Sequence, residues 1–187
     1  IRSSIPTIQY CLNAGASVVL MSHLGRPNGV YSSNMSLDPI SFILEDFLGE
    51  EVLFSDDCIS EDSIELSSQM ESGEVHLLEN LRFHKEEIEN NENFAWYLSR
   101  HGNVYINDAF GTAHRSHASN VAITKYVHDK CCGLLIEKEI EFLFEALKQP
   151  TSPIVLLLGG SKVDDKEELI DNLADKVDDI LIGGSMA

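Results

Sequence analysis

The sequence predicts an α/β protein built from doubly wound parallel sheets. Short apolar runs recur along the chain, and several of them are followed by a turn and then by a helical pattern. Strands that alternate with helices favour parallel sheets. The run at residues 154–158 is apolar throughout rather than alternating, as expected of a strand that is covered on both faces. The candidate strands are residues 17–21, 51–54, 75–78, 104–106, 154–158 and 179–182.

Helical patterns lie between several of these strands. Apolar residues at helical spacing open the chain at residues 5–12, and we expect further helices at residues 37–48, 93–100 and 166–176. The acidic, Asn-rich segment 85–93 is expected to be a solvated turn. The predicted elements therefore follow the strand–turn–helix order of an open α/β sheet.

One helical stretch differs from the others. Apolar residues between Leu135 and Leu147 form a stripe at helical spacing, and the stretch ends before Pro150 and Pro153, which stop helical continuation. It can be a connector between two α/β lobes or an ordinary surface helix of one domain, and we interpret it as a connector.

Composition narrows the class of protein. The chain has 187 residues, 43% of them hydrophobic, and 31 acidic residues against 13 Lys and Arg give a net charge of −18. This charge argues against nucleic-acid binding, which needs a basic face. No apolar run approaches the ~20 residues that span a membrane. Four cysteines without a CxxC pair favour reduced thiols in a cytosol over a disulfide or metal framework.

The few cations gather after the predicted strands. His23 and Arg26 follow residues 17–21, Arg82 follows residues 75–78, and Arg115 follows residues 104–106. Ligands of open α/β sheets bind beyond the carboxyl ends of strands. Each loop taken alone can be a turn with surface cations, and Arg82 could pair with Glu79. Together they predict one basic pocket, which focuses the field locally whatever the net charge is.

The densest polar run lies at residues 106–117. It contains His114, Arg115 and His117 together with several small hydroxyl and amide donors. A zinc site at the two histidines lacks a third ligand at the usual spacing. Arginine binds carboxylate and phosphate through two parallel hydrogen bonds. We therefore expect an anion site here and no bound metal.

Two glycine turns follow the last two strands. Gly159 and Gly160 lead into a helix start with Lys162 and Lys166, whose spacing of four places both on one helical face. Free backbone N–H groups and the helix dipole make such a turn an anion site. The spacing is neither a Walker loop nor GxGxxG. The second turn, Gly183 and Gly184, can flank a flat base.

These runs together resemble the phosphoglycerate kinase family. The matching stretches are VVLMSHLGRPNG, LLENLRFHKEE, VYINDAFGTAHRSH, LLGGSKVDDKEELIDNL and LIGGSMA, and they occur in the family's order. The resemblance implies two Rossmann-like lobes joined by a helix, with most of the phosphoglycerate-binding lobe at residues 1–132, the interdomain helix at 133–149 and the start of the nucleotide-binding lobe at 150–187. The family is longer, so we expect a central fragment that is inactive by itself.

The resemblance also implies a reaction. Members transfer a phosphoryl group in line, after lobe closure, between 1,3-bisphosphoglycerate and ADP to give 3-phosphoglycerate and ATP in glycolysis. They are cytoplasmic and monomeric, and their nucleotide carries Mg²⁺, whose protein ligand is expected outside this chain. The alternative is a phosphate-anion-binding α/β module without catalysis.

Site roles are carried over by motif. The resemblance assigns phosphoglycerate binding to His23, Arg26, Arg82, His114 and Arg115. It assigns nucleotide binding to Gly159, Gly160, Ser161, Lys162, Lys166, Gly183 and Gly184. The catalytic residues it implies are Arg115, Lys162 and Lys166.

Overall fold

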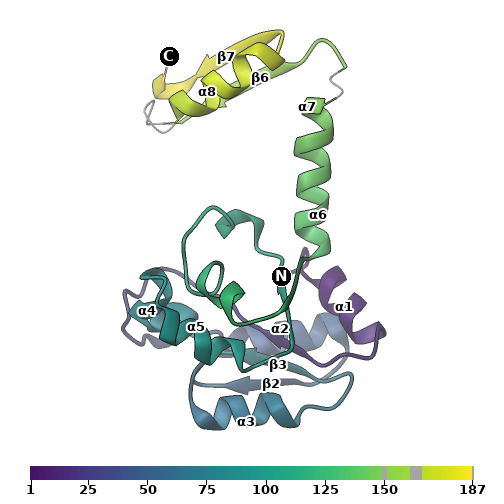
Figure 1. Ribbon diagram of the computed structural model, residues 1–187, viewed down its shortest axis with the longest axis vertical. Coiled ribbons are helices and arrows are strands. Elements are labelled where there is room, and N and C mark those ends of the chain that lie inside the picture. Colours follow the sequence, from purple (N-terminus) through teal and green to yellow (C-terminus); the bar gives the residue numbers. More distant parts are fainter. Residues whose placement is uncertain (149–150, 161–165, 187) are drawn as a thin grey trace. The chain divides into compact units, whose positions relative to one another are not determined.

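The computed structural model describes residues 1–148, 151–160 and 166–186. The chain divides into two compact units, Ile1–Glu137 and Lys138–Ala187 (Figure 1). Every strand pair recorded among the described residues is parallel, and helices lie between successive strands. The predicted α/β class with parallel sheets is therefore confirmed.

The first unit contains a three-stranded parallel sheet of order β1-β3-β2. β1 is Val18–Leu20, β2 is Val52–Ser55 and β3 is Val75–Leu78. β3 lies in the middle, and its register places Val75 opposite Val18 on one side and Val52 on the other. All three strands begin at one edge, so the loops that follow them leave from the opposite, carboxyl edge.

A second parallel pair in this unit joins β4, Val104–Asn107, to β5, Asp129–Cys132. Sequence reasoning missed β5. Its side chains are exposed, and it starts with Asp129 and Lys130, so it lacks the apolar run used to recognise strands. It exists through its backbone pairing with β4, which a sequence pattern does not reveal.

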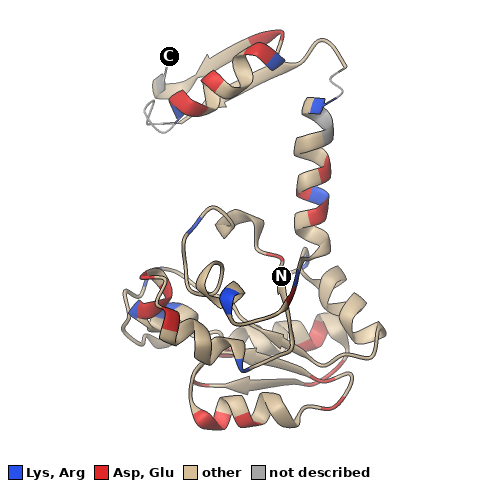
Figure 2. Ribbon diagram, viewed as in Figure 1, with Lys and Arg blue, Asp and Glu red and all other residues tan. Residues whose placement is uncertain are grey.

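The helices of the first unit cover the sheets and fill the connections. α2 starts with Pro39 in its first turn and ends at Gly49, whose φ of 74° is left-handed. α3, Glu61–Gln69, was not predicted because its sequence is largely polar, and Figure 2 shows acidic residues along it. Ser60 caps this helix by accepting a hydrogen bond from Ser63 N. The α-helices are α1 Ile5–Asn13, α2 Asp38–Leu48, α3 Glu61–Gln69, α4 Lys85–Ile88 and α5 Glu92–Ser99, and the 3-10 turns are Ser33–Met35, Leu81–Phe83, Phe110–Thr112 and Ala122–Lys125.

β3 separates two hydrophobic clusters. Val75 and Leu77 belong to one cluster, which includes Ile8 and Leu44 from helices α1 and α2. Leu78 belongs to the other, with residues of α5 and the segment that follows β4. Successive side chains of a strand point to opposite faces, so a strand buried on both sides must be apolar nearly throughout.

Residues 85–93 are not the solvated turn expected from their composition. Lys85–Ile88 form α4, and Glu87 is only 3% exposed. Most residues of the segment are exposed as expected, but the segment contains a helix and Glu87 is buried, which its acidic composition did not indicate. Buried partners contributed by a distant segment of the chain stabilise Glu87, as described below.

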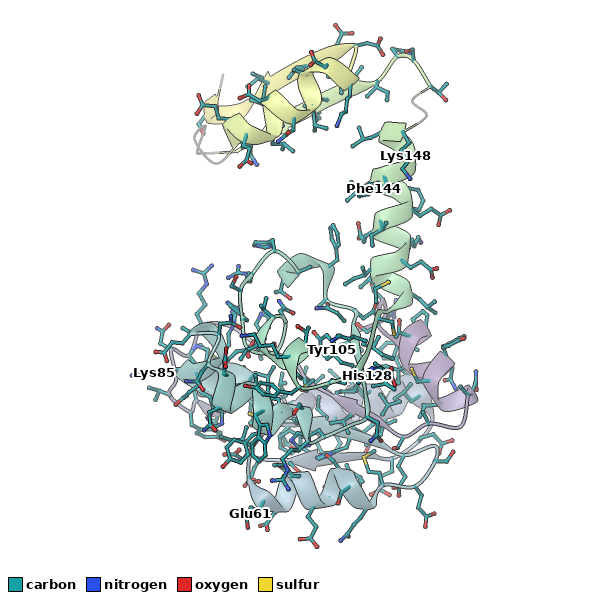
Figure 3. All side chains as sticks on the ribbon, in the orientation of Figure 1. Glu61, Lys85, Tyr105, His128, Phe144 and Lys148 are labelled. Carbon is teal, nitrogen blue, oxygen red and sulfur yellow. The ribbon has the colours of Figure 1, made fainter. Side chains whose placement is uncertain are left out.

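The helix predicted near residues 133–149 begins as α6, Leu134–Ile140, which starts in the first unit and continues past Glu137 into the second. A π-helical stretch, Glu141–Glu145, and α7, Ala146–Lys148, follow it. Within the second unit the ammonium of Lys148 lies 5.5 Å from the centre of the Phe144 ring (Figure 3). Its role as a connector stays a prediction.

The second unit pairs β6, Val155–Gly159, in parallel with β7, Asp179–Gly183. α8, Glu167–Leu173, and a 3-10 turn, Ala174–Lys176, lie between them where residues 166–176 were predicted to be helical. Across the described residues of both units, no helix has the length and apolar character needed to cross a membrane.

Candidate functional site

Three arginines from three different loops line one open pocket of about 320 Å³ in the first unit. Arg26 follows β1, Arg82 follows β3 and Arg115 follows β4, as the order of elements shows. The remaining lining residues are Asn28, Ile88 and His117. The fold thus brings together the arginines that the sequence places after separate strands, at the carboxyl edge where ligands of parallel sheets bind.

Asn80 joins the first two of these loops. Its fully buried side chain donates to the carbonyls of Leu24 and Met35, both at 2.8 Å, and accepts a hydrogen bond from Arg82 N at 3.1 Å. A buried amide that meets three partners cannot leave them without exposing unsatisfied polar groups. Asn80 therefore fixes the position of the loop after β1 relative to Arg82.

The Arg82 guanidinium is held by a backbone carbonyl rather than by a carboxylate. One of its terminal guanidinium nitrogens donates to the carbonyl of Gly25 at 2.8 Å. Glu79, considered as its partner, instead accepts from Ser36 Oγ at 2.6 Å and from Leu37 N at 2.8 Å. The charge of Arg82 therefore remains available to the pocket.

Two donors in this region have no protein partner. Among the described residues, the Nε–H groups of Arg82 and Arg115 are buried and donate to no acceptor. A buried donor without a partner costs about 1–3 kcal/mol. An anion with several oxygens would satisfy both, which fits a carboxylate or phosphate ligand.

Two histidines near the pocket arginines have lowered pKa values: His117, which lines the pocket, and His23, which does not belong to the lining set. Burial, followed by the charges of Arg82, His117 and Arg115, lowers the pKa of His23 to about 4. Burial and the same two arginines, followed by His114, lower the pKa of His117. Burial is the larger cause of both shifts, and the nearby like charges add to it because they disfavour the protonated imidazole.

Glu87 is a functional residue that sequence reasoning missed. Its carboxylate accepts from Ser119 N at 3.0 Å and Ser119 Oγ at 2.6 Å, and it lies 3.6 Å from Nδ1 of His117. Its backbone carbonyl accepts from Ala118 N at 2.8 Å. Burial raises the pKa of Glu87, opposed by the Ser119 hydrogen bonds and by Arg82. Glu87 thus holds residues 117–119 against the pocket.

His117 was predicted to lie in the anion-binding run at residues 106–117 but was assigned no binding role of its own, and it lines the pocket. His114, which the resemblance assigns to phosphoglycerate, is exposed and does not belong to the lining set. The position of His117, two residues after Arg115, could have indicated a binding role, because both side chains can face one ligand from the same loop. The sequence near Glu87 does not indicate its burial, because its partner, Ser119, is 32 residues away.

A hydrogen-bond network supports the loop that carries Arg115. Asn107 Nδ2 donates to the Tyr105 hydroxyl at 3.0 Å and to Asn120 Oδ1 at 3.2 Å, and the Tyr105 hydroxyl donates to Ser119 O at 2.7 Å. Asn120 in turn donates to Thr112 O at 2.7 Å. The run of small polar residues after β4 therefore builds a defined loop. Tyr105, labelled in Figure 3, is buried beneath it.

The two glycine turns of the second unit lie side by side. Gly159 and Gly183 are register partners at the ends of β6 and β7. Ser185 Oγ donates to the carbonyl of Gly160 at 2.8 Å, which ties the second turn to the first. Lys166 precedes α8 and is half-buried. Ser161 and Lys162 lie outside the described residues.

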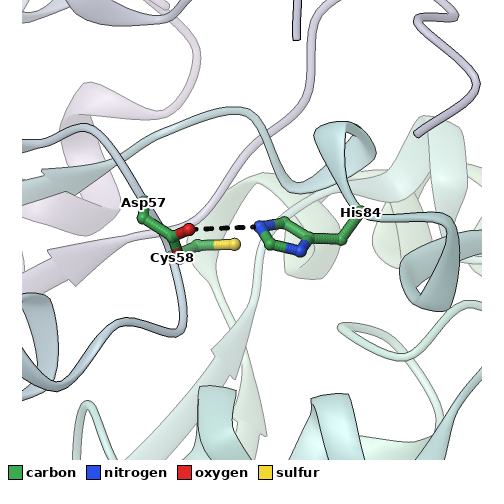
Figure 4. Close-up of side chains that lie close together, drawn as sticks. All are labelled: Asp57, Cys58 and His84. Atoms are coloured by element: carbon green, nitrogen blue, oxygen red, sulfur yellow. Dashed lines mark ion pairs between the residues drawn. The ribbon is translucent and has the colours of Figure 1, made fainter. Parts of the chain in front are cut away.

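One other cluster offers metal-binding atoms. Among the described residues, Asp57, Cys58 and His84 form the one group whose ligand atoms lie within 4.8 Å of one another (Figure 4). The Asp57 carboxylate is 3.7 Å from the His84 ring and also accepts from the backbone N–H of Ile59 and Ser60. Burial raises the pKa of the Cys58 thiol well above its usual value. A protonated thiol is a poor ligand, and no residue of this cluster lines the arginine pocket.

Parallel sheets and a cationic pocket at their carboxyl edge define an α/β protein suited to a phosphorylated anion. Comparison with known proteins narrows this class. The sequence model described as phosphoglycerate kinase matches residues 1–187, and the chain therefore belongs to the phosphoglycerate kinase family.

Relatives and solved structures agree with this assignment. The chain is 49% identical to the phosphoglycerate kinase of Acidobacterium capsulatum and 45% identical to that of Prochlorococcus marinus, with all of the chain and 48% and 46% of those proteins covered. It is similar to the structure of phosphoglycerate kinase from Coxiella burnetii, with a TM-score of 0.82, 38% identity, and 97% of this chain and 45% of that one covered. The Pyrococcus horikoshii enzyme gives a TM-score of 0.85, 35% identity, and coverage of 98% and 47%. The chain spans about half the length of these proteins.

Proposed function

We propose that the full-length protein catalyses phosphoryl transfer between 1,3-bisphosphoglycerate and ADP to give 3-phosphoglycerate and ATP. Membership of the phosphoglycerate kinase family supports this reaction. The observation that carries the proposal furthest is the pocket lined by Arg26, Arg82 and Arg115. Phosphoryl transfer needs positioning and charge neutralisation more than a covalent nucleophile, and such a cluster supplies both.

In this proposal the pocket holds the phosphorylated three-carbon acid. Arg82 and Arg115 bind the phosphate that is not transferred, which is supported by their buried Nε donors. His23 and Arg26 contact the same ligand, and His114 lies alongside it. His117 joins this set because it lines the pocket. Fixed charges in a site that excludes water stabilise the developing negative charge, which gives Arg115 a catalytic role as well.

The nucleotide is proposed to bind at the glycine turns of the second unit. Gly159, Gly160 and Ser161 would approach its phosphates, Lys162 and Lys166 would bind them and neutralise the moving group, and Gly183 and Gly184 would line the base. The pairing of Gly159 with Gly183 supports one shared binding edge. Lobe closure would then bring the two ligands into line.

Mg²⁺ is proposed to enter with the nucleotide, and it neutralises charge on the phosphates. It takes oxygen ligands in near-octahedral geometry, so the thiol and imidazole of the Asp57, Cys58 and His84 cluster do not suit it. Its protein ligand is proposed to lie outside this chain, and the residues proposed here act on the phosphates directly.

The protein is further proposed to be a cytoplasmic monomer without nucleic-acid or membrane partners. Four free cysteines fit a reducing compartment, and a net charge of −18 disfavours nucleic acid. Light scattering on the purified full-length protein should give the mass of one chain. A stable dimer would contradict this part of the proposal.

A coupled spectrophotometric assay of the full-length gene product tests the reaction. We expect turnover that requires both 3-phosphoglycerate and MgATP in the direction of acyl-phosphate formation. Binding of 3-phosphoglycerate without turnover would refute the kinase function and favour a non-catalytic phosphate-binding module. Absence of both binding and turnover would contradict the pocket assignment as well.

A further inference from the structure

Two consecutive residues at the end of β4 direct their side chains to different parts of the chain. Asn107 bonds to Tyr105 and Asn120, and its Oδ1 accepts from Ala109 N at 3.1 Å, so it shapes the loop that carries Arg115. Asp108 bonds instead to the first turn of α6. One peptide unit therefore joins the anion-binding loop to the helix that leaves the first unit.

The Asp108 carboxylate satisfies the start of α6. Its Oδ1 accepts from Leu135 N at 2.9 Å and from Ile136 N at 3.3 Å. Its Oδ2 accepts from Thr7 Oγ1 at 2.6 Å, and the same hydroxyl accepts from Leu134 N at 3.0 Å. The first N–H groups of a helix have no partner within the helix, and here they are satisfied by a distant carboxylate and a hydroxyl of α1.

The contact leaves no room for adjustment at Gly133. A Cβ atom there would lie 2.3 Å from Asp108 Oδ1, so only glycine allows this approach. Gly133 N also donates to the carbonyl of Asn107 at 2.8 Å. The turn before α6 is thus bound to both residues at the end of β4. Hydrogen bonds to an ionised acceptor are about twice as strong as neutral ones.

This arrangement differs from an ordinary helix cap. Ser60 caps α3 by a single hydrogen bond from Ser63 N, three residues away in the sequence. Asp108 accepts hydrogen bonds from N–H groups that are 27 and 28 residues away in the sequence. It also accepts one from Thr7, which belongs to a third segment, helix α1. Such a link orients one element relative to another, whereas a local cap stabilises only its own helix.

We propose that Asp108 is a positioning residue that fixes the direction in which α6 leaves the loop carrying Arg115. The inference rests on the proposed function in one respect: the residues that follow α6 are those proposed to bind nucleotide phosphates. Misplacing reacting groups by about 1 Å can cost about 100-fold in rate even when the change is far from the chemistry. Asp108 therefore acts on turnover through geometry, without touching the ligand.

The test uses the full-length protein and four variants. Asp108→Ala removes all acceptors, Asp108→Asn keeps one oxygen for the helix N–H groups, and Thr7→Val removes only the hydroxyl. Ser60→Ala is the matched control, because it deletes a helix cap elsewhere in the same unit. The measurements are kcat, the Kd of 3-phosphoglycerate by calorimetry, and hydrogen exchange of residues 134–136.

For Asp108→Ala we expect kcat to fall at least tenfold while the Kd of 3-phosphoglycerate stays within about twofold, and exchange at residues 134–136 to accelerate. Asp108→Asn should recover most of kcat, and Thr7→Val should give an intermediate loss. Ser60→Ala should leave kcat and this exchange unchanged. If Asp108→Ala does not fold, the Asn and Val variants decide the question by the same measurements.

Unchanged exchange at residues 134–136 in the Asp108 variants would overturn the link, whatever the enzyme's turnover. A loss of 3-phosphoglycerate affinity as large as the loss of kcat would show that Asp108 serves the pocket and not the helix. A wild-type protein that lacks turnover would contradict the proposed reaction instead, and the exchange and affinity measurements would still decide the link.

Discussion

Nδ1 of His117 lies 3.6 Å from Oε1 of Glu87, and Glu87 is buried although it belongs to an acidic segment. The same carboxylate binds Ser119 through two hydrogen bonds. A single negative charge therefore supports the wall of a positively charged pocket. This relationship places the histidine beside the arginines and makes Glu87 a structural requirement of the site.

Replacing Glu87 by alanine should destabilise the protein by about 1–3 kcal/mol, the usual cost of leaving buried hydrogen-bonding groups without partners. Ser119 N and Oγ lose their acceptor in this variant. Urea unfolding followed by circular dichroism measures the change in the free energy of unfolding. Glu86→Ala, at the exposed neighbouring position, should change it by less than about 0.5 kcal/mol. Equal effects of the two substitutions would contradict the assigned role.

Arg115→Ala should weaken 3-phosphoglycerate binding by about tenfold or more, because the loss of a hydrogen bond to a charged group costs about 1.5–3 kcal/mol. Arg115 lines the pocket and its Nε has no protein partner, so the substitution removes a ligand contact and breaks no side-chain pair recorded there. Titration calorimetry gives the Kd directly. Arg100→Ala, whose guanidinium stacks on Trp96 outside the pocket lining, serves as the control. Unchanged affinity in Arg115→Ala would remove this residue from the site.

Binding of 3-phosphoglycerate should take up protons. Arg82 and Arg115 help to lower the pKa values of His23 and His117 in the free pocket, and a bound dianion raises them again. Protonation of the histidines therefore increases the affinity for 3-phosphoglycerate. This gain is present at pH values below the pKa that the histidines have in the complex, and it is lost as the pH rises through that pKa.

Calorimetry at one pH in buffers of different ionisation enthalpy counts these protons. We expect uptake of a fraction of a proton near pH 7, larger at pH 6.5 than at pH 8, and smaller in His117→Gln. His128→Gln, at a fully exposed position, should behave as the wild type. The same uptake in His117→Gln and in the wild type would remove His117 from this account and leave His23 or the ligand itself as the group that binds the protons.

Acid should destabilise the fold through two buried histidines. Ser67 Oγ lies 2.9 Å from His76 Nδ1 and 2.7 Å from His101 Nδ1, and His101 Nε2 lies 3.0 Å from the carbonyl of Cys58. A carbonyl only accepts, so His101 carries its proton on Nε2. Its Nδ1 and the carbonyl of Ser63, which lies 3.1 Å from Ser67 Oγ, share the single hydroxyl proton of Ser67. Ser67 then accepts from His76 Nδ1–H, and Ser55 donates to His76 Nε2 at 2.8 Å. Each ring nitrogen has a partner in the neutral state, and a second proton on either ring would find no acceptor among these partners other than Ser67 and Ser55.

Burial, with a smaller contribution from His101, lowers the pKa of His76 to about 4, and burial lowers that of His101. The unfolded chain binds these protons near pH 6.5. Stability is therefore fully present above about pH 6.5 and falls as the pH drops towards 4, by up to about 1.4 kcal/mol per pH unit for each group. Urea unfolding at pH 7.5, 6 and 5 should show this decline. A smaller slope is expected in His76→Gln, and a slope equal to that of the wild type would contradict this account.

The sequence by itself determined the strands that are mainly apolar, although β3 also contains the buried polar residue His76. β3 has apolar residues on both faces, at Val75 and Leu78, because two different clusters cover it. The arginines after β1 and β3 could also be expected to meet, since parallel strands of one sheet present their carboxyl ends at one edge, whereas β4 pairs with β5 in a separate sheet. Motif order was enough to indicate the family.

The tertiary structure decided what depends on partners distant in the sequence. β5 exists through pairing with β4 and not through its own composition, and Glu87 is buried because Ser119 and His117 approach it from 30 or more residues away. Asp108 faces α6 rather than the pocket for the same reason. Apolar periodicity is local and can be read along one strand or helix, whereas the partner of a polar side chain is known only once the chain has folded.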